Sequence, residues 1–245
     1  MTRLLYKSWP VFVLVLFLTG CTSPTNKLTD ERTGFWDVYV VGQLSDFLDW
    51  IAHLLWNQYG LALLVLTILV RSAILPLSLK QYSSSKRMQA LQPELKKLKE
   101  KYKDDAKKQQ EETMKLFQTN GVNPLAGCFP LLIQMPVFIG LYQAIMRNPD
   151  ISGHTFLWLK LGVADPFYVL PVLAALTTFI QQKMMPTQVN GSMKALLYVF
   201  PVLIFFMSLN FASALPLYWV YSNTYTIVQS YFIYRPDRKN GKAAA

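Results

Sequence analysis

The sequence has few charged residues, and acidic residues are the scarcer kind. Its 245 residues include 14 Asp or Glu and 24 Lys or Arg, which together make 16% of the chain. Soluble domains carry about 25% charged residues. Hydrophobic residues make 52% of this chain, so the composition is that of a membrane protein. The two cysteines, Cys21 and Cys128, do not predict a disulfide framework, because Cys128 borders an apolar run and Cys21 follows one.

Five long segments contain no Asp or Glu and predict membrane-spanning helices. Each has about the 20 residues that a helix needs to cross the hydrocarbon layer. The missing carboxylates argue against a proton- or ion-coupled transporter, which usually carries them within the membrane. The sequence also has no phosphate-binding loop and no metal-ligand cluster, so we expect no catalytic residues, no cofactor and no metal. The predicted spans are residues 59–79, 125–147, 166–186, 195–212 and 214–234.

The N-terminus predicts a processed lipoprotein. Arg3 and Lys7 precede an apolar run of about ten residues that ends in the letters LTGC at Cys21, an order typical of a secretory signal peptide. We expect cleavage after residues 1–20 and lipidation of Cys21. The alternative is an uncleaved signal anchor with an incidental cysteine, which the shortness of the run disfavours.

Basic residues between the spans set the predicted orientation in a bacterial plasma membrane. Nearly half of all Lys and Arg lie between the first two spans, and basic residues favour the cytoplasmic side. The N-terminus is therefore predicted to lie outside and the C-terminus inside. An amphipathic helix over residues 35–57 is expected to lie in the outer membrane interface. The predicted cytoplasmic segments are 80–124, 187–194 and 235–245, and the predicted outer segments are 21–58 and 148–165.

The cytoplasmic segment 80–124 predicts a charged helical hairpin. Apolar residues spaced 3, 4, 3 and 4 apart form one narrow seam: Met88, Leu91, Leu95, Leu98 and Tyr102. Asp104-Asp105 predicts a turn, and a return helix presents Gln110, Met114 and Phe117 on one face. A basic loop that only fixes topology is one interpretation. The length of the hairpin favours contact with anionic headgroups, a ribosome or a nascent chain.

One cation lies deep in the first predicted span. Arg71 precedes Lys80 by nine residues, which is roughly 13 Å along a helix. That depth is beyond the reach of a snorkelling side chain, and the predicted spans contain no acid. Neutral polar residues are scattered through all five spans, and each one alone is most simply interhelical hydrogen-bonding. Together with Arg71 they favour a hydrated recess, in which a fixed cation attracts negative groups from the cytoplasm.

Four segments carry a known pattern. They are LTILVRSAILPL around Arg71, GVNPLAGCFPLLIQMPVFIGLY at the second predicted span, FIQQKMMP ending the third, and LPLYWVYSNTYTIVQ in the fifth. In this order they resemble the YidC/Oxa/Alb family of membrane protein insertases. The lipoprotein signal is similar to that of the Gram-positive type.

The resemblance implies an all-α membrane protein whose five-helix bundle has a polar groove open to the cytoplasm. By motif, Arg71 matches the groove arginine of the family and Trp219 its groove-lining aromatic. Gln181 or Gln182 matches a polar residue on the third span, and neighbours on a helix differ by about 100° in facing, so both remain candidates. The polar residues Thr67, Gln134 and Asn223 complete the predicted groove.

The predicted function is a membrane protein insertase and chaperone that is not an enzyme. It would move client transmembrane segments from the cytoplasm into the bilayer without nucleotide hydrolysis. A small-anion channel or transporter and a non-catalytic assembly scaffold are the alternatives. The expected partners are nascent membrane proteins and anionic lipid headgroups, with the ribosome and the Sec translocon as further candidates. No recognition of nucleic-acid sequence is expected.

Overall fold

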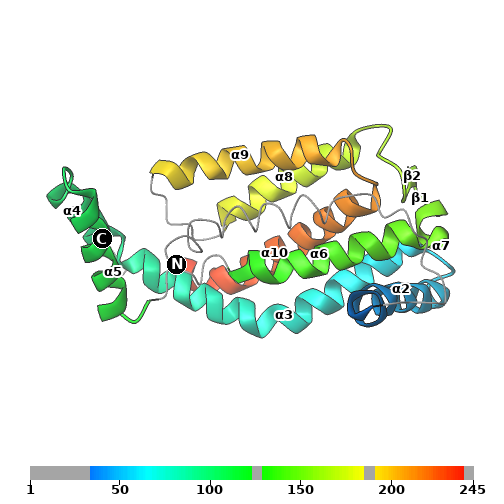
Figure 1. The fold of residues 1–245 in the computed structure, drawn as a ribbon, viewed down its shortest axis with the longest axis horizontal. Coiled ribbons are helices and arrows are strands. Elements are labelled where there is room, and N and C mark those ends of the chain that lie inside the picture. Colours follow the sequence, from blue (N-terminus) through cyan, green and yellow to red (C-terminus); the bar gives the residue numbers. More distant parts are fainter. Residues whose placement is uncertain (1–33, 123–128, 185–190, 240–245) are drawn as a thin grey trace. The chain divides into compact units, whose positions relative to one another are not determined.

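The structure is a computed structural model that describes residues 34–122, 129–184 and 191–239. The predicted signal peptide and Cys21 lie outside these residues. Within them the chain is almost entirely helical, with one short antiparallel strand pair (Figure 1). The chain divides into two compact units, and each is described by itself. The first unit takes in the chain up to Ala62 and Ile133–Val163, and the second Leu63–Leu132 and the chain from Ala164.

The first unit packs one helix against the C-terminal part of another. A π-helical turn, η1 (Asp37–Val41), leads into α2 (Gly42–Leu54), which faces α6 (Phe129–Arg147). Gly140 makes this approach possible, because a Cβ there would lie 2.9 Å from Cγ1 of Val40. Leu48 and Ile51 on α2 are buried in the unit. The apolar stripe that predicted an interfacial helix thus packs mainly on protein, while Trp50 and Leu54 remain exposed.

A short irregular segment completes the first unit. It contains α7 (Pro149–Gly153) and the strands β1 (Thr155–Phe156) and β2 (Leu159–Lys160). The strands are antiparallel, with Thr155 opposite Lys160. An outer loop is predicted here, and the strands could not be predicted, because two-residue strands carry no alternating pattern.

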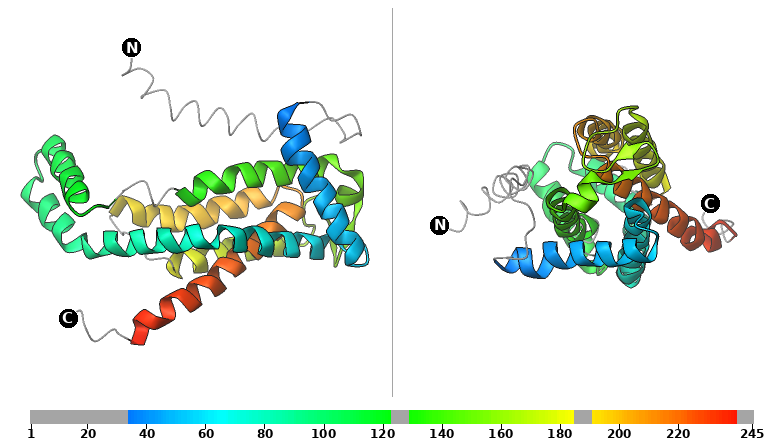
Figure 2. Two further views of the ribbon diagram at one scale, coloured as in Figure 1. Left: turned by 90° about the horizontal axis from the view of Figure 1, so that it is seen from below. Right: turned by 90° about the vertical axis from the view of Figure 1, so that its right-hand side faces the viewer.

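Four long helices and a helical hairpin contribute to the second unit. In the unit α8 (Val169–Met184) packs against both α9 (Gly191–Ser208) and α10 (Ala214–Lys239). The helix α3 (Tyr59–Ala90) is continuous, as Figure 2 shows, and runs eleven residues past the predicted end of the first span. Within the described part of the chain, α3 has both the length and the composition of a membrane span, and Tyr198–Ser208 is a shorter apolar helix. Each predicted span overlaps a helix of the described residues, and the number that cross the membrane stays a prediction.

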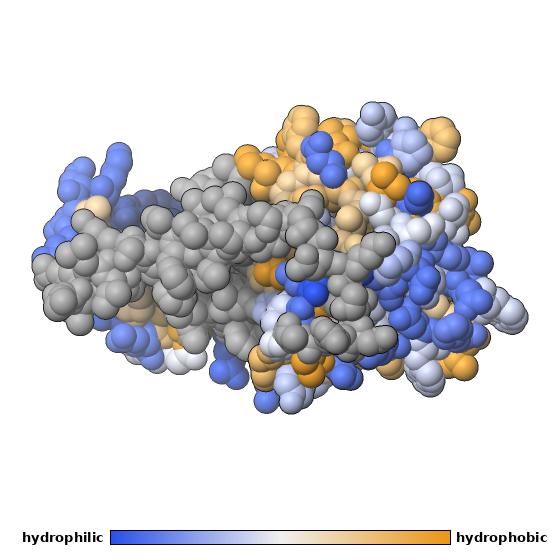
Figure 3. All heavy atoms as spheres, turned by 45° about the vertical axis from the view of Figure 1, so that its right-hand side comes forward, coloured by the Kyte–Doolittle hydropathy of each residue, from blue (hydrophilic) through white to orange (hydrophobic). Residues whose placement is uncertain are grey.

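Exposed apolar side chains follow one face of α9. Val199, Val202 and Phe206 are each more than half exposed and recur at helical spacing. Figure 3 shows hydrophobic side chains at the surface, beside hydrophilic ones. Apolar faces of this extent are unfavourable in water, and they agree with a chain surrounded by lipid.

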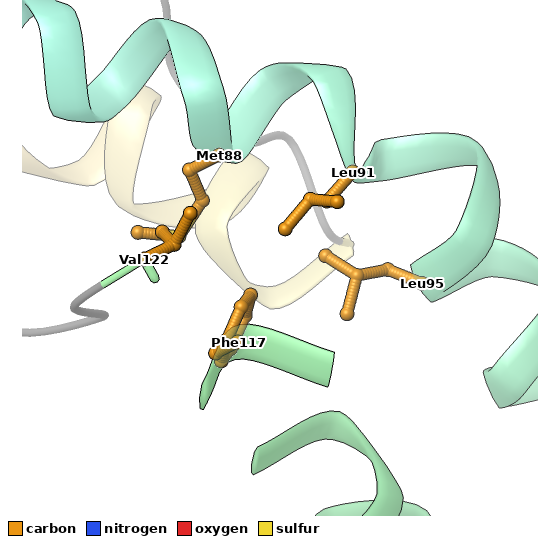
Figure 4. Packing of buried hydrophobic residues seen from close by; sticks show 5 residues of the cluster. All are labelled: Met88, Leu91, Leu95, Phe117 and Val122. Carbon is orange, nitrogen blue, oxygen red and sulfur yellow. The ribbon is translucent and has the colours of Figure 1, made fainter. Parts of the chain in front are cut away.

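The helices of the predicted cytoplasmic hairpin begin and end at other residues than expected. The chain breaks at Leu91, and α4 (Gln92–Lys101) begins with Pro93 in its first turn, where a residue without an N–H is tolerated. Asp105 caps α5 (Ala106–Thr119) by accepting a 3.0 Å hydrogen bond from the Lys108 amide. Five buried side chains join the end of α3 to α4 and α5 (Figure 4): Met88, Leu91, Leu95, Phe117 and Val122.

Two details of the predicted hairpin core differ from the structure. Of the three residues expected on one face of the return helix, Phe117 is buried, whereas Met114 is 44% exposed and Gln110 is also exposed. Val122, which the seam did not include, fills that core instead, since the Val122 amide bonds to the Phe117 carbonyl and folds the chain back.

Candidate functional site

Arg71 is held by the helix α10. Its Nε donates a 2.8 Å hydrogen bond to Oγ of Ser222, and its Nη2 donates to the same oxygen. Next to it, the hydroxyls of Ser72 and Tyr225 share a 3.0 Å hydrogen bond. The serine that orients the guanidinium is neutral, so this contact positions the positive charge without neutralising it.

A second polar contact joins α10 to α8. Thr178 is buried, and its Oγ1 accepts hydrogen bonds from Nε1 of Trp219 at 3.1 Å and Nδ2 of Asn223 at 2.9 Å. The same hydroxyl donates to the Ala174 carbonyl at 2.6 Å, and Nδ2 of Asn223 also reaches Oγ1 of Thr177 at 3.1 Å. The structure therefore brings together Trp219 and Asn223, two of the predicted groove residues.

The two contacts share one helix. Ser222 and Asn223 are consecutive in α10, so their side chains point about 100° apart. One reaches Arg71 on α3, and the other reaches Thr178 on α8. We call the side chains of Arg71, Ser222, Asn223, Thr178 and Trp219 the polar bridge.

The sequence signal for the polar bridge was incomplete. Ser222 and Thr178 stood out only as polar residues within spans, and Tyr225 did not stand out at all. Trp219 and Asn223 are four residues apart on one helix face, which is a usable signal. Nothing in the sequence paired them with Thr178, because the partners lie 41 and 45 residues away.

The adjacent glutamines on α8 differ in their surroundings. Gln182 lies four residues after Thr178 and thus on the same helix face. Its Oε1 is buried and has no hydrogen-bond partner among the described residues. Gln181 is half-buried. A buried carbonyl oxygen without a donor is costly, which makes Gln182 the better candidate for contact with a bound group.

The two remaining predicted groove residues are Thr67 and Gln134. Thr67 is 1% exposed, and its hydroxyl donates a 2.6 Å hydrogen bond to the Leu63 carbonyl of its own helix. That hydroxyl is satisfied locally, as expected for a packing residue. Gln134 is half-buried on α6 and belongs to the first unit.

The first unit has a polar cluster of its own. Arg147 makes a two-pronged ion pair with Asp37, with N–O distances of 2.8 and 2.7 Å. The Arg147 guanidinium holds the pKa of the Asp37 carboxyl below its usual range. Asn148 donates to Ser45 at 2.9 Å and to both carboxylate oxygens of Asp49. These contacts fix η1 and α2 on the end of α6.

Among the described residues, no group of three His, Cys, Asp or Glu side chains could hold a metal ion. His154 is isolated from other ligands, and burial lowers its pKa. The polar bridge consists of one cation and neutral hydrogen-bonding groups. Such a set can attract and orient an anionic or polar segment, and it contains no nucleophile paired with a base.

Comparison with known proteins gives consistent matches. The family model described as "60Kd inner membrane protein" matches residues 50–240. "Membrane protein insertase MisCA" of Bacillus subtilis (strain 168) is 51% identical over 231 residues, covering 91% of this chain and 88% of that protein. "Membrane protein insertase YidC 2" of Bacillus anthracis is 48% identical over 240 residues, covering 95% of this chain and 94% of that protein.

A solved structure is similar as well. It is described as "Active YidC insertase crystal structure with the first transmembrane domain resolved" and matches with a TM-score of 0.67 at 25% sequence identity. The match covers 94% of this chain and 52% of that one, so this chain spans about half the length of the solved protein.

Proposed function

Because the chain belongs to the 60Kd inner membrane protein family, which includes the YidC insertases, we propose that it is a membrane protein insertase. It moves client transmembrane segments from the cytoplasm into the lipid bilayer, and it needs no nucleotide. The four sequence motifs predicted this family, and that prediction is confirmed.

The single observation that carries the proposed mechanism is the position of the Arg71 guanidinium. It lies on α3, the helix with the length and composition of a span, and Ser222 orients it without altering its charge. The predicted spans contain no Asp or Glu. A fixed positive charge at this depth attracts the polar or acidic segment that precedes the first apolar helix of a client.

The charge acts together with the neutral members of the polar bridge. Hydroxyl and amide groups of Thr178 and Asn223 can exchange hydrogen bonds with a polar segment and with water. This lowers the cost of moving that segment out of bulk water, which is several kcal/mol for an unpaired polar group. The apolar client helix then partitions into lipid, and about 25 cal/mol per Å² of buried apolar surface supplies the driving force.

The arrangement in the membrane is part of the proposal. Five spans form the bundle, with a groove that opens to the cytoplasm and the lipid. The mature chain begins outside at a lipidated Cys21 and ends inside. The basic hairpin of α4 and α5 meets anionic headgroups and the arriving client, and the ribosome and the Sec translocon are candidate partners there.

A client series tests the role of the charge. Clients that differ only in the number of acidic residues before the apolar helix are inserted by vesicles that carry Arg71, Arg71→Lys, Arg71→Ala or Arg71→Glu. Protease-protected client is the readout. Lys should retain much of the activity, because a point charge suffices in a hydrated groove, whereas a two-pronged clamp would need the guanidinium. Glu should be worse than Ala for acidic clients, since like charges repel.

Arg87 provides the matched control. It is an exposed arginine on the same helix, beyond the predicted span. Arg87→Glu makes the same change in net charge and should leave the dependence on client charge intact. Equal defects of the Arg71 variants for every client would instead assign Arg71 a structural or hydrating role. Flux of a small anion through vesicles of the purified protein would favour a channel.

A further inference from the structure

Bulky side chains occupy strained backbone positions in two loops of the first unit. Leu157, at the turn between β1 and β2, has φ +57°, and Trp56, between α2 and α3, has φ +53°. A left-handed conformation is normally left to Gly, Asn or Asp, and it is costly for a large side chain. Tight hairpins of this length favour Asn-Gly for the same reason. The residues at these two positions are therefore not explained by the turns that they form.

Both side chains point away from the protein. Leu157 is 70% exposed and Trp56 is 84% exposed, and Trp158 beside Leu157 is 41% exposed. Large apolar groups at loop tips gain nothing from water, and the strain of the left-handed backbone is added to that cost. Strained and exposed positions of this kind point to a function outside the fold.

The β1–β2 hairpin that presents Leu157 is anchored in the first unit by buried residues and a backbone hydrogen bond. On either side of the tip, Leu159 and Leu161 are buried, and the Leu161 amide donates to the His154 carbonyl at 3.0 Å. The ring of Phe156 packs on Gly60, where a Cβ would lie only 2.1 Å from the ring. Gly60 is in the first turn of α3, so the hairpin and the beginning of this helix are fixed to each other.

The length of α3 indicates what surrounds the tip. From Gly60 to Lys80 the helix rises about 30 Å, which is the thickness of the hydrocarbon layer. If Lys80 lies at the inner boundary, as the basic hairpin requires, the first turn of α3 lies at the outer boundary. The hairpin tip and Trp56, which precedes Gly60 by four residues, are both attached there.

We propose that Leu157 and Trp158, together with Trp56, insert into the glycerol and carbonyl layer of the outer leaflet and set the depth of α3 in the membrane. Tryptophan prefers this layer, since its ring is apolar and its N–H finds an acceptor. Lys160 is exposed at the base of the hairpin, where it can meet a lipid phosphate. Through α3 the tip also fixes the depth of Arg71, which lies roughly 16 Å along the helix from Gly60.

Fluorescence quenching in vesicles of the purified full chain tests this proposal. Trp158→Phe and Trp56→Phe each remove one emission component, which is obtained as the difference from the unsubstituted protein. We expect lipids brominated near the headgroup to quench both components more than lipids brominated mid-chain. Quenching by aqueous iodide instead would overturn the proposal and leave the tips as a surface for a protein partner. A component that neither reagent quenches would overturn it as well.

Leu157→Asn separates lipid contact from folding. Asparagine adopts the left-handed conformation readily, so the unfolding midpoint in detergent should stay unchanged or rise. Quenching of Trp158 by brominated lipid should fall at least about twofold, because the apolar side chain that inserts beside it is lost. Unchanged quenching would mean that Leu157 does not contact lipid, and the proposal would then fail for the hairpin.

Discussion

Replacing Ser222 by alanine separates two contributions of the Arg71 guanidinium to client insertion. One comes from its fixed position and the other from its charge. In the structure Oγ of Ser222 accepts from both Nε and Nη2 of Arg71. Ser222→Ala removes this acceptor, leaves the charge on α3 and creates little empty volume. The variant therefore changes the orientation of the guanidinium and leaves its charge in place.

The expected loss of stability is modest. Hydrogen bonds to a charged group contribute about 1.5–3 kcal/mol when buried. Arg71 is half-buried, so water and neighbouring groups replace part of the loss, and we expect about 1 kcal/mol. For a chain of this size that corresponds to a fall of about 2–4 °C in the unfolding midpoint in mild detergent.

The functional effect should be smaller than that of removing the charge. Ser222→Ala should insert acidic clients at a rate within about threefold of the unsubstituted protein, which is less than 1 kcal/mol. The preference for acidic over neutral clients should persist. Ser230→Ala is the matched control, because Ser230 is another buried serine of α10. If Ser222→Ala abolishes the preference as fully as Arg71→Ala, a fixed guanidinium geometry and not the charge carries client capture.

Three further predictions concern the first unit and its surface. Asp37→Asn should lower stability by about 1–2 kcal/mol at pH 7. Because the folded pKa of Asp37 is lowered, the difference should begin to shrink as the pH falls below about 4 and should vanish below the folded pKa. Thermal midpoints across pH measure this, and Glu100→Gln, at an exposed acid, is expected to change nothing measurable. Gly60→Ala should cost about 1–3 kcal/mol by overpacking against Phe156, and Phe156→Ala in the same chain should recover part of that loss. His154 has a folded pKa below its unfolded value near 6.5, so stability should fall as the pH drops below about 6.5, and His154→Gln should remove that dependence in the same titration.

Helices were predictable where a long apolar run has a clear end. The five predicted spans each correspond to a helix, because hydrophobic length is a strong signal. The ends were less certain: α3 continues to Ala90, since no Gly or Pro follows Pro76 before Pro93. The apolar run marks where lipid could begin and end, whereas the helix ends where the backbone is interrupted. The end of a membrane span and the end of its helix are therefore set by different physical causes and need not fall at the same residue.

Within the candidate site, Arg71 could be identified from the sequence, but its serine partner could not. Arg71 stood out because a charge within an apolar run is costly. Its partner Ser222 is 151 residues away, and serine is common in membrane helices as an interhelical donor. The strained loop tips were invisible in the sequence, because Leu157 and Trp56 read there as ordinary apolar residues. Only their backbone conformation and exposure distinguish them.

The polar bridge has a consequence for how a client could enter. The backbone of α10 packs closely along α8, whereas Arg71 and Ser72 of α3 reach α10 through side-chain hydrogen bonds. Interhelical hydrogen bonds within a membrane are worth about 0.6 kcal/mol each, so contacts of the second kind open easily. A client segment that takes the place of Ser222 exchanges the two hydrogen bonds between Arg71 and Ser222 for new ones and leaves the α8–α10 packing intact. Under the proposed function we therefore expect the client to pass between α3 and α10, with α8 and α10 acting as the fixed wall.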